Sequence, residues 1–326
     1  MFGSDPEFFI ADKTNTPVPA HLFFPPKEAP FLESSGGETI KMFRDGYALE
    51  LNIPPRTCRQ EFAGRIRAGL HAAQSKLPTG YSLLAIPSIK INLKDLADAP
   101  EDVLLFGCDA VADAYSGEDR SVNLNGLTHP YRYAGGHLHY SGTWPWLADR
   151  KARDLCVKML DLYLGVPFTF LFHDLGEFRR RKHYGQAGEY RFQQYPDGTR
   201  GIEYRVLSPR VMNHPCLLSL CNGILRHVVT NFVKLRPGWD ATIEPKVRRA
   251  INTGFRAQEL LTTLPTFYTP ELLGLAEGAF SVFEMGQKDN YEGWGSWIGQ
   301  KTGRALAYYT ADKAHYLNHP EPHFWY

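Results

Sequence analysis

The sequence predicts an α+β fold, in which strands form one curved antiparallel sheet and amphipathic helices pack on its outer face. Several short segments carry charged or histidine side chains two residues apart, which is the period of a strand. Longer segments, such as 213–234, repeat apolar residues every three or four positions, which is the period of a helix. The 326 residues suffice to bury a core. We expect residues 1–210 to form the sheet core with the functional site, and residues 211–326 to complete the same domain with helices.

Composition excludes several classes of protein. A net charge of +1 gives no basic footprint for nucleic acid. The polar Gly3-Ser4-Asp5 leads us to expect no signal peptide, and no apolar run approaches the ~20 residues that cross a bilayer. Five cysteines without close metal spacing favour reduced thiols over a disulfide framework. We therefore expect a soluble cytoplasmic protein with small-molecule or peptide substrates and no membrane or nucleic-acid partner, and we leave its oligomeric state open.

The first predicted strand carries two acids. Asp5 and Glu7 stand two apart in a segment rich in Phe and Ile, so both carboxylates face one side. Pro6 between them favours an edge strand or a strand start, where no ladder hydrogen bond is lost. The alternative is an N-cap and turn made by Ser4-Asp5-Pro6.

A strand–helix unit follows at residues 48–76. Glu50 and Asn52 share one face of a strand that we expect to end at Pro54-Pro55. Thr57 and Gln60 then fit the capping box of a helix that runs to about residue 76. The unit therefore adds a third acid on a strand.

Two histidines occupy a later strand, directly behind Gly135-Gly136. His137 and His139 share one face, and the glycines allow a backbone or a ligand to approach closely. A single histidine is usually a satisfied core or surface residue, but this pair favours metal or phosphate binding. Zinc is one candidate, and the carboxylates elsewhere favour Mg²⁺.

The second half of the chain shows helical spacing at about 146–164, 213–234, 244–261 and 270–285. Residues 168–173 fit either a strand or the continuation of a buried helix. The basic run Arg179-Arg180-Arg181-Lys182 predicts a phosphate-contacting loop, with a solvated loop as the alternative.

A charged pair of strands follows this basic run. Glu189-Tyr190-Arg191 and Glu203-Tyr204-Arg205 flank a turn of the x-P-D-G type at 195–198. Each repeat places a carboxylate and a guanidinium on one face and a tyrosine on the other. Burying two carboxylates and two guanidiniums on one face of a sheet is unfavourable unless they have a function. Carboxylates that bind metal beside arginines that bind phosphate would be such a function.

These strands together bring acids, imidazoles and arginines to one sheet. That chemistry suits a polyphosphate bound through divalent metals, with guanidiniums stabilising charge on a transferred phosphoryl group. The sequence lacks both the Gly-x-x-x-x-Gly-Lys-[Ser/Thr] loop and a Gly-x-Gly-x-x-Gly after a strand, so the two common nucleotide-binding folds are not expected.

Five motifs, in order, carry a resemblance to a known family: DPEFF, ALELNIPP, AGGHLHY, YGxAGEYR and GIEYR. Over residues 3–210 the chain resembles the phage carboxylate–amine (COOH–NH2) ligases of type 2, in the glutamine synthetase and glutamate–cysteine ligase superfamily. The resemblance implies a glutamine-synthetase-like sheet that cradles ATP and about two or three Mg²⁺ ions, with Mn²⁺ as a substitute. A carboxylate would attack the γ-phosphate to give an acyl phosphate, and an amine would then form the amide.

The resemblance also implies roles for individual residues. One departure concerns the first strand, which has Asp-Pro-Glu where much of the superfamily has Glu-x-Glu, so Asp5 would contact metal through water or not at all. The implied metal ligands are Asp5, Glu7, Glu50, His137 and Glu203; the ATP contacts are Arg179, Arg180, Arg181, Lys182 and Arg205; the catalytic residues are Arg191 and Arg205; and the substrate contacts are His139, Asn52 and Glu189.

Two other functions remain open at this point. A kinase of the same fold would phosphorylate a guanidino or carboxyl group without an amine acceptor. A nucleotide-binding regulatory protein would keep the site without turnover.

Overall fold

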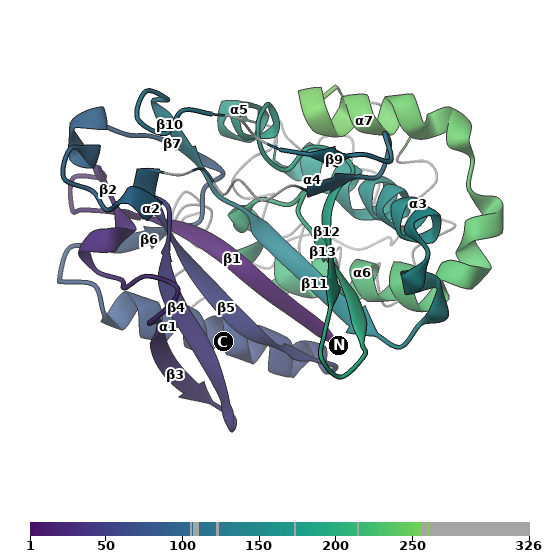
Figure 1. Cartoon of the computed structure of the whole chain (residues 1–326), viewed down its shortest axis with the longest axis horizontal. Helices are drawn as coiled ribbons and strands as arrows, with labels where there is room; N and C mark the ends of the chain where they lie inside the picture. Colours follow the sequence, from purple (N-terminus) through teal and green to yellow (C-terminus); the bar gives the residue numbers. More distant parts are fainter. Residues whose placement is uncertain are drawn as a thin grey trace, which may run out of the picture.

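The computed structural model describes residues 1–104, 106, 111–121, 124–172, 174–213, 215–255 and 260 of the chain. One large antiparallel sheet dominates these residues (Figure 1). One of its central strands is β1 (Phe2–Ala11), which pairs with β5 (Ala48–Arg56) on one side and β11 (Gly136–Gly142) on the other. The predicted mixed fold with an antiparallel sheet is confirmed, whereas the helix expected at 270–285 lies outside the described residues.

The remaining strands extend this sheet on both sides of β1. The order is β3 (Phe31–Ser35), β4 (Glu38–Asp45), β5, β1, β11, β13 (Arg200–Tyr204), β12 (Glu189–Gln194), β8 (Val111–Asp113) and β9 (Asp119–Arg120). Two short strands also pair with β1, namely β2 (Pro17–Val18) and β6 (Ser82–Leu84). A separate small sheet joins β7 (Ser88–Lys90) to β10 (Tyr131–Tyr133).

Helices connect and cover these strands. They are α1 (Arg59–Ser75), α2 (Glu101–Leu104), α3 (Arg150–Leu160), a π-helical segment (Asp161–Gly165), α4 (Val166–Leu171), α5 (Leu175–Arg181), α6 (Pro215–Leu235) and α7 (Glu244–Thr253). Short 3₁₀ turns cover Ala20–Leu22, Leu93–Leu96, Pro145–Ala148, Pro209–Met212, Arg236–Gly238 and Ala241–Ile243. Beyond residue 210 the described elements are helical, and residues 261–326 lie outside the description.

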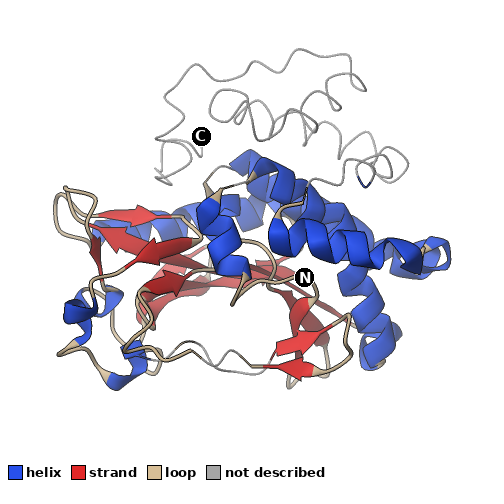
Figure 2. Ribbon diagram, turned by 90° about the horizontal axis from the view of Figure 1, so that it is seen from above, coloured by secondary structure: helices blue, strands red, loops and turns tan. Residues whose placement is uncertain are grey.

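The two faces of the sheet differ because side chains alternate along each strand. One face is apolar and packs against α1, α3 and α6 to form the main core (Figure 2). Phe8, Leu51, Leu138 and Tyr204 are among its buried side chains. Burial of this face supplies the main driving force for folding, and it leaves the opposite face of the central strands for polar residues.

Three predictions about the first strands and helix are wrong. Pro6 lies inside the central strand β1, where it stands opposite Gly136 of β11 and falls between the two residues, Ser4 and Glu7, that pair with β5. Strand β5 continues through Pro54-Pro55 to Arg56. Because the strand extends this far, helix α1 begins at Arg59 with Cys58 as its N-cap, rather than with Thr57.

The middle of the chain is more helical than the sequence predicted. The segment 150–171 is one continuous helix through α3, the π-helical segment and α4, so the second of the two alternatives for residues 168–173, a continued helix, is the one that residues 168–171 adopt. The basic run from Arg179 to Arg181 ends helix α5 rather than forming a loop. Asp174 caps this helix by accepting hydrogen bonds from the backbone N–H groups of Gly176 and Glu177.

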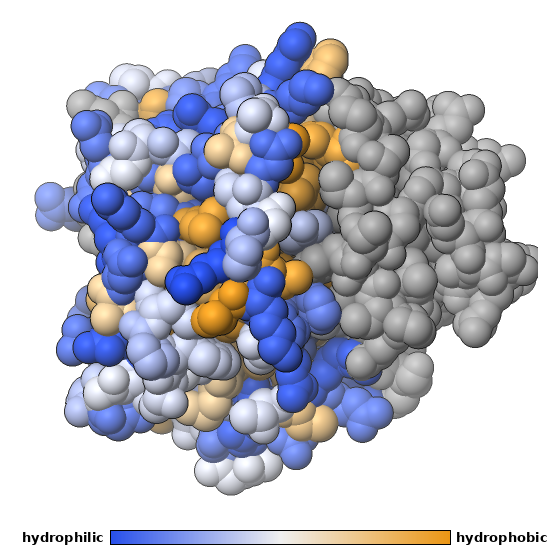
Figure 3. Space-filling view, turned by 90° about the vertical axis from the view of Figure 1, so that its right-hand side faces the viewer, coloured by the Kyte–Doolittle hydropathy of each residue, from blue (hydrophilic) through white to orange (hydrophobic). Residues whose placement is uncertain are grey.

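The surface that Figure 3 presents is mainly hydrophilic, with hydrophobic residues gathered near the middle of the view.

Helix α6 spans 21 residues, and it packs its apolar residues into the core. Within the described part of the chain, no helix combines the length and apolar character that spanning a bilayer requires.

Candidate active site

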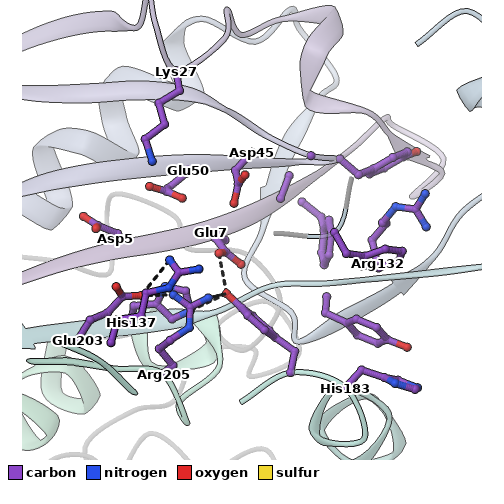
Figure 4. Close-up of a pocket in the computed structure, with 18 of the residues that line it drawn as sticks. Asp5, Glu7, Lys27, Asp45, Glu50, Arg132, His137, His183, Glu203 and Arg205 are labelled. Atoms are coloured by element: carbon purple, nitrogen blue, oxygen red, sulfur yellow. Dashed lines mark hydrogen bonds and ion pairs between the residues drawn. The ribbon is translucent and has the colours of Figure 1, made fainter. Parts of the chain in front are cut away.

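The polar face of the central strands lines a cavity of about 270 Å³ (Figure 4). The strand register places Glu7 opposite Glu50, Asp5 opposite His137, and Glu203 between His139 and Arg191. Side chains predicted on separate strands therefore do converge, and they come from β1, β5, β11, β12 and β13. Those that line the cavity are Asp5, Glu7, Glu50, His137, Arg191, Glu203 and Arg205.

Three acids form a cluster on one side of this cavity. One carboxylate oxygen from each of Glu7, Asp45 and Glu50 lies within 4.8 Å of the other two. Burial and then the nearby Asp45 charge raise the pKa of Glu7 to about 7, against the opposing effect of Arg205. Burial, with the charges of Asp45 and other acids, also raises the pKa of Glu50 well above its usual range. Ionisation of all three carboxylates without a bound cation is thus unfavourable, and a cation bound between them would reduce their mutual repulsion.

The donor set of this cluster fits a hard divalent cation. Its three side chains offer only carboxylate oxygens, which suit Mg²⁺ or Mn²⁺ better than softer metals. Asp45 comes from the end of β4, while Glu7 and Glu50 come from neighbouring strands β1 and β5. Figure 4 shows the three carboxylates on the same side of the cavity, with Lys27 above them.

Asp5 is engaged differently from these three acids. Its Oδ1 accepts a hydrogen bond from Asn52 Nδ2 at 2.8 Å, and its Oδ2 lies 3.1 Å from His139 Nε2. Burial alone would lower the pKa of His139, but the Asp5 carboxylate, with Glu203 and Gln193, raises it to about 9. His139 is therefore a cation at neutral pH, and both it and Asn52 hold Asp5 in place.

A second wall of the cavity is built around Glu203. Arg205 donates a hydrogen bond from Nη1 to Glu203 Oε1, and His137 Nδ1 lies 3.2 Å from the same oxygen. Arg191 Nη1 lies 4.0 Å from it. Burial and the neighbouring Arg205 lower the pKa of His137 well below its usual range, so this imidazole is neutral. The wall keeps buried positive charge opposite the acid cluster.

Tyr184 connects the two walls. Its hydroxyl donates to Glu7 Oε1 at 2.9 Å, lies 2.6 Å from His137 Nε2, and accepts from Arg205 Nη2 at 2.9 Å. A hydroxyl has one proton, so it serves Glu7 or His137 at any moment while Arg205 donates to its oxygen. Because Glu7, His137 and Arg205 all contact this one hydroxyl, a shift of any of them changes the hydrogen bonding available to the other two.

The far end of the cavity is aromatic. Phe106, Tyr133 and His183 line it, and the rings of Tyr133 and His183 stack with centroids 5.6 Å apart. Arg132 lies over the Phe106 ring and donates to the carbonyl oxygens of His129 and Tyr131. The cavity thus passes from charged at one end to aromatic at the other.

The predicted basic run does not line the cavity. Arg180 is fully buried, and its guanidinium donates to the carbonyl oxygens of Ala134, Arg205, Val206 and Leu207 at 2.6–3.0 Å. With its donors used in this way, Arg180 cannot also bind phosphate. This corrects its expected role as an ATP contact.

The other members of the run also have partners or positions elsewhere. Arg179 lies over the Tyr131 ring, 4.2 Å from its centroid, and Arg181 pairs with Glu177 at 3.3 Å. Lys182 is exposed at the end of α5. The buried Glu189, expected to contact substrate, instead accepts from the backbone N–H of Gly185 at 2.6 Å and lies outside the cavity lining.

Several residues that line the cavity were not predicted from the sequence. Asp45 belongs to the Arg44-Asp45-Gly46 turn, which carried no two-residue pattern, and Tyr184 begins the YGxAGEYR motif without having been singled out. Both residues are recognised as part of the cavity only once the fold places the turn and the motif beside β1. The other cavity-lining residues that were not predicted are Phe9, Lys27, Gly46, Tyr47, Ala48, Phe106, Arg132, Tyr133, His183 and Gln193.

Comparisons with known proteins agree with part of this description. Residues 112–253 match the model of the family described as phage phiEco32-like COOH.NH2 ligase-type 2. No curated protein matches the chain. Among solved structures, a bifunctional glutathione synthetase from Pasteurella multocida is 12% identical, with a TM-score of 0.48 over 94% of this chain and 49% of its own. The chain therefore spans about half the length of that protein.

The family match covers a defined part of the site. His137, Glu203, Arg205 and Tyr184 lie inside the matched residues, whereas the acid cluster of Glu7, Asp45 and Glu50 precedes them in the chain. Residues 112–253 are thus similar to a family of carboxylate–amine ligases, and this match supports an enzyme that forms carbon–nitrogen bonds.

Proposed function

We propose that the chain is an ATP-dependent carboxylate–amine ligase of glutamine-synthetase-like fold, which forms an amide or peptide bond through an acyl phosphate. The observation that carries this proposal is one cavity with two opposed walls. A three-carboxylate cluster lies on one side, and the buried Arg205–Glu203 pair lies on the other, joined by Tyr184. The second wall falls in the segment that matches the ligase family.

In this proposal Glu7, Asp45 and Glu50 hold a divalent cation, with Glu203 and His137 as candidate ligands for another. A bound divalent cation would neutralise phosphate charge and polarise the transferring phosphoryl group. Asp5 supports the site through Asn52 and His139 rather than by direct ligation, in keeping with its short side chain.

The reaction would proceed in two displacements. An oxygen of the substrate carboxylate attacks the γ-phosphorus and ADP leaves, which gives the acyl phosphate. The amine nitrogen then attacks the acyl carbon, loses a proton, and phosphate leaves. Arg205 and Arg191 face the cavity where charge develops on the transferring group, so their guanidiniums would stabilise it. Glu203 orients Arg205, and Tyr184 links this arginine to Glu7.

The two ends of the cavity would receive different parts of the reactants. Rings at the aromatic end offer stacking surfaces for a nucleobase, and the phosphates would then extend toward the acid cluster. The end lined by Asp5, Arg191 and Gln193 remains for the carboxylate and the amine.

An omission experiment tests the proposal. The purified chain is incubated with Mg²⁺ and ATP and with pools of carboxylates, amines, both or neither, and ADP, phosphate and products are measured. A ligase gives sustained ADP and phosphate release only with both pools. A kinase gives a phosphorylated product that survives without amine. ATP binding without ADP release under every condition would leave only the regulatory function.

A further inference from the structure

The middle residues of the two Glu-Tyr-Arg repeats point away from the cavity and into the core. Tyr190 and Tyr204 stand opposite each other in the register of β12 and β13, and both are buried. Each hydroxyl donates to an aspartate on the long helix behind the sheet. Tyr190 donates to Asp154 Oδ1 at 2.7 Å, and Tyr204 donates to Asp161 Oδ1 at 2.8 Å.

The two aspartates come from one face of one helix. Asp154 and Asp161 are seven residues apart, which corresponds to about two helical turns. Asp161 begins the π-helical segment, and the backbone N–H of Val166 donates to its carbonyl oxygen. Single π-helical turns of this kind are rare and occur often at functional sites. The helix therefore contacts both charged strands at two fixed points.

The two contacts are not equivalent. Tyr204 lies between Glu203 and Arg205, which both line the cavity, whereas Tyr190 has only Arg191 as a cavity-lining neighbour. Asp161 is fully buried, whereas Asp154 keeps 13% of its side chain exposed.

The Tyr204 hydroxyl is also enclosed on another side. A Cβ atom added at Gly165 would lie only 2.8 Å from this hydroxyl, so the glycine allows the close approach of helix and strand. Burial raises the pKa of Asp161 to about 7, and the hydrogen bond from Tyr204 opposes this shift. The Asp161–Tyr204 contact is therefore a closely packed, buried polar pair, with the Tyr115 side chain also interacting with Asp161.

We propose that Asp161, through its hydrogen bond to Tyr204, is a positioning residue for Glu203 and Arg205. The inference rests on the proposed function of these two side chains. Glu203, in β13, and Arg205, directly after it, are the chain neighbours of Tyr204, and both side chains project to the opposite face. The position of the tyrosine therefore determines where both side chains lie. A displacement of about 1 Å at a phosphoryl-transfer site can cost about a hundredfold in rate.

The test compares matched phenylalanine variants. Tyr204→Phe and Tyr190→Phe each remove one hydroxyl that is bonded to the same helix. The inference expects Tyr204→Phe to lower kcat by about tenfold or more, with KM for ATP within about twofold. Tyr190→Phe should keep kcat within about twofold of the wild type. All values are divided by the folded fraction from circular dichroism, since a purely stabilising role would alter that fraction alone.

Two substitutions at the helix test the direction of the effect. Asp161→Asn keeps an acceptor oxygen and should retain kcat within about threefold, whereas Asp161→Leu should behave like Tyr204→Phe. Equal kcat values for Tyr204→Phe and Tyr190→Phe, or full activity of Asp161→Leu, would overturn the inference.

A readout without turnover separates this inference from the proposed function. If the wild type releases no ADP with any pool, the proposed function fails by itself. Amide hydrogen exchange in residues 200–206 still reports on the positioning, since Tyr204→Phe should accelerate it and Asp161→Asn should not. Unchanged exchange in Tyr204→Phe would refute the contact between helix and strand as the device that orders β13.

Discussion

At the scale of single residues, the proposed cation site depends on which carboxylates lie close together. Asp5 was expected to bind metal, but Asn52 and His139 contact both of its oxygens. Asp45 was not expected, yet it lies with Glu7 and Glu50 in the only three-acid group found among the described residues. A cation site proposed here therefore relies on Asp45 more than on Asp5.

Asp45→Asn should weaken Mn²⁺ binding by about tenfold or more, because it removes one of the cluster's three anionic ligands. Calorimetric titration of the chain with Mn²⁺ measures the affinity. Asp102→Asn is the control, since Asp102 pairs with Arg44 nearby and its side chain is 47% exposed. Equal affinities in Asp45→Asn and the control would remove Asp45 from the metal site.

Tyr184→Phe should shift the pH dependence of Mn²⁺ binding upward. The hydrogen bond from Tyr184 lowers the pKa of Glu7, which stands at about 7 in its presence. Without the hydroxyl, the pKa rises, and protons compete with the cation up to a higher pH. Mn²⁺ titrations over a pH series measure the midpoint. Tyr195→Phe, which removes a hydroxyl bonded to Gln193 instead, should leave that midpoint where it is, and an unshifted midpoint in Tyr184→Phe would contradict the linking role.

At the scale of elements, helix α5 shows why a basic run was misinterpreted. Four consecutive basic residues suited a phosphate loop as sequence, but a helix turns successive side chains in different directions. One of them, Arg180, reaches the carbonyl oxygens that precede β11 and follow β13. Sequence alone does not show which backbone carbonyls need a donor, because that depends on strands distant in the chain.

Arg180→Met should lower the free energy of unfolding by about 3 kcal/mol or more, because it leaves several buried carbonyl oxygens without a donor. Urea unfolding followed by circular dichroism measures the loss. Lys182→Met is the matched control, since Lys182 is an exposed residue of the same run, and it should stay near the wild type. A weakened affinity for ATP with unchanged unfolding would restore the phosphate-binding interpretation.

At the scale of the whole molecule, much of the sheet followed from period-two patterns. Asp5 and Glu7 lie in β1 and His137 and His139 lie in β11, as expected, whereas Glu203 lies in β13 and Arg205 directly follows that strand. The register aligns Asp5 with His137 and His139 with Glu203. The cavity residues Asp45 and Tyr184, which lie outside these patterned strands, could not be predicted in the same way. The position of Asp45 depends on how the β4–β5 turn meets β1, and that of Tyr184 on how the loop after α5 folds back.

The acid cluster should make stability depend on pH and on divalent cations. The pKa of Glu7 rises from 4.5 to about 7 on folding, so its protonated form is favoured in the folded state. The contribution of Glu7 to the free energy of unfolding is fully present below about pH 4.5. It is lost as pH rises through about 7, which lowers the free energy of unfolding by at most about 3 kcal/mol. Bound Mg²⁺ should restore much of it at high pH.

Urea unfolding at about pH 5 and about pH 8, with EDTA or with Mg²⁺, measures this dependence. Glu7→Gln should show a smaller fall in stability with EDTA and a smaller response to Mg²⁺. The same Mg²⁺ response in both proteins at the higher pH would show that the ion binds elsewhere.

The central claim is that one cavity joins a carboxylate to an amine at the expense of ATP, with Glu203 and Arg205 at its reacting centre. The most direct measurement is ADP formation with Mg²⁺ over pools of amino acids, polyamines and peptides, in the wild type and in Glu203→Ala. The account predicts that some pool stimulates ADP formation by the wild type, and that Glu203→Ala loses it by about a hundredfold or more while remaining folded. No stimulation by any pool, or turnover of Glu203→Ala within a few-fold of the wild type, would contradict it.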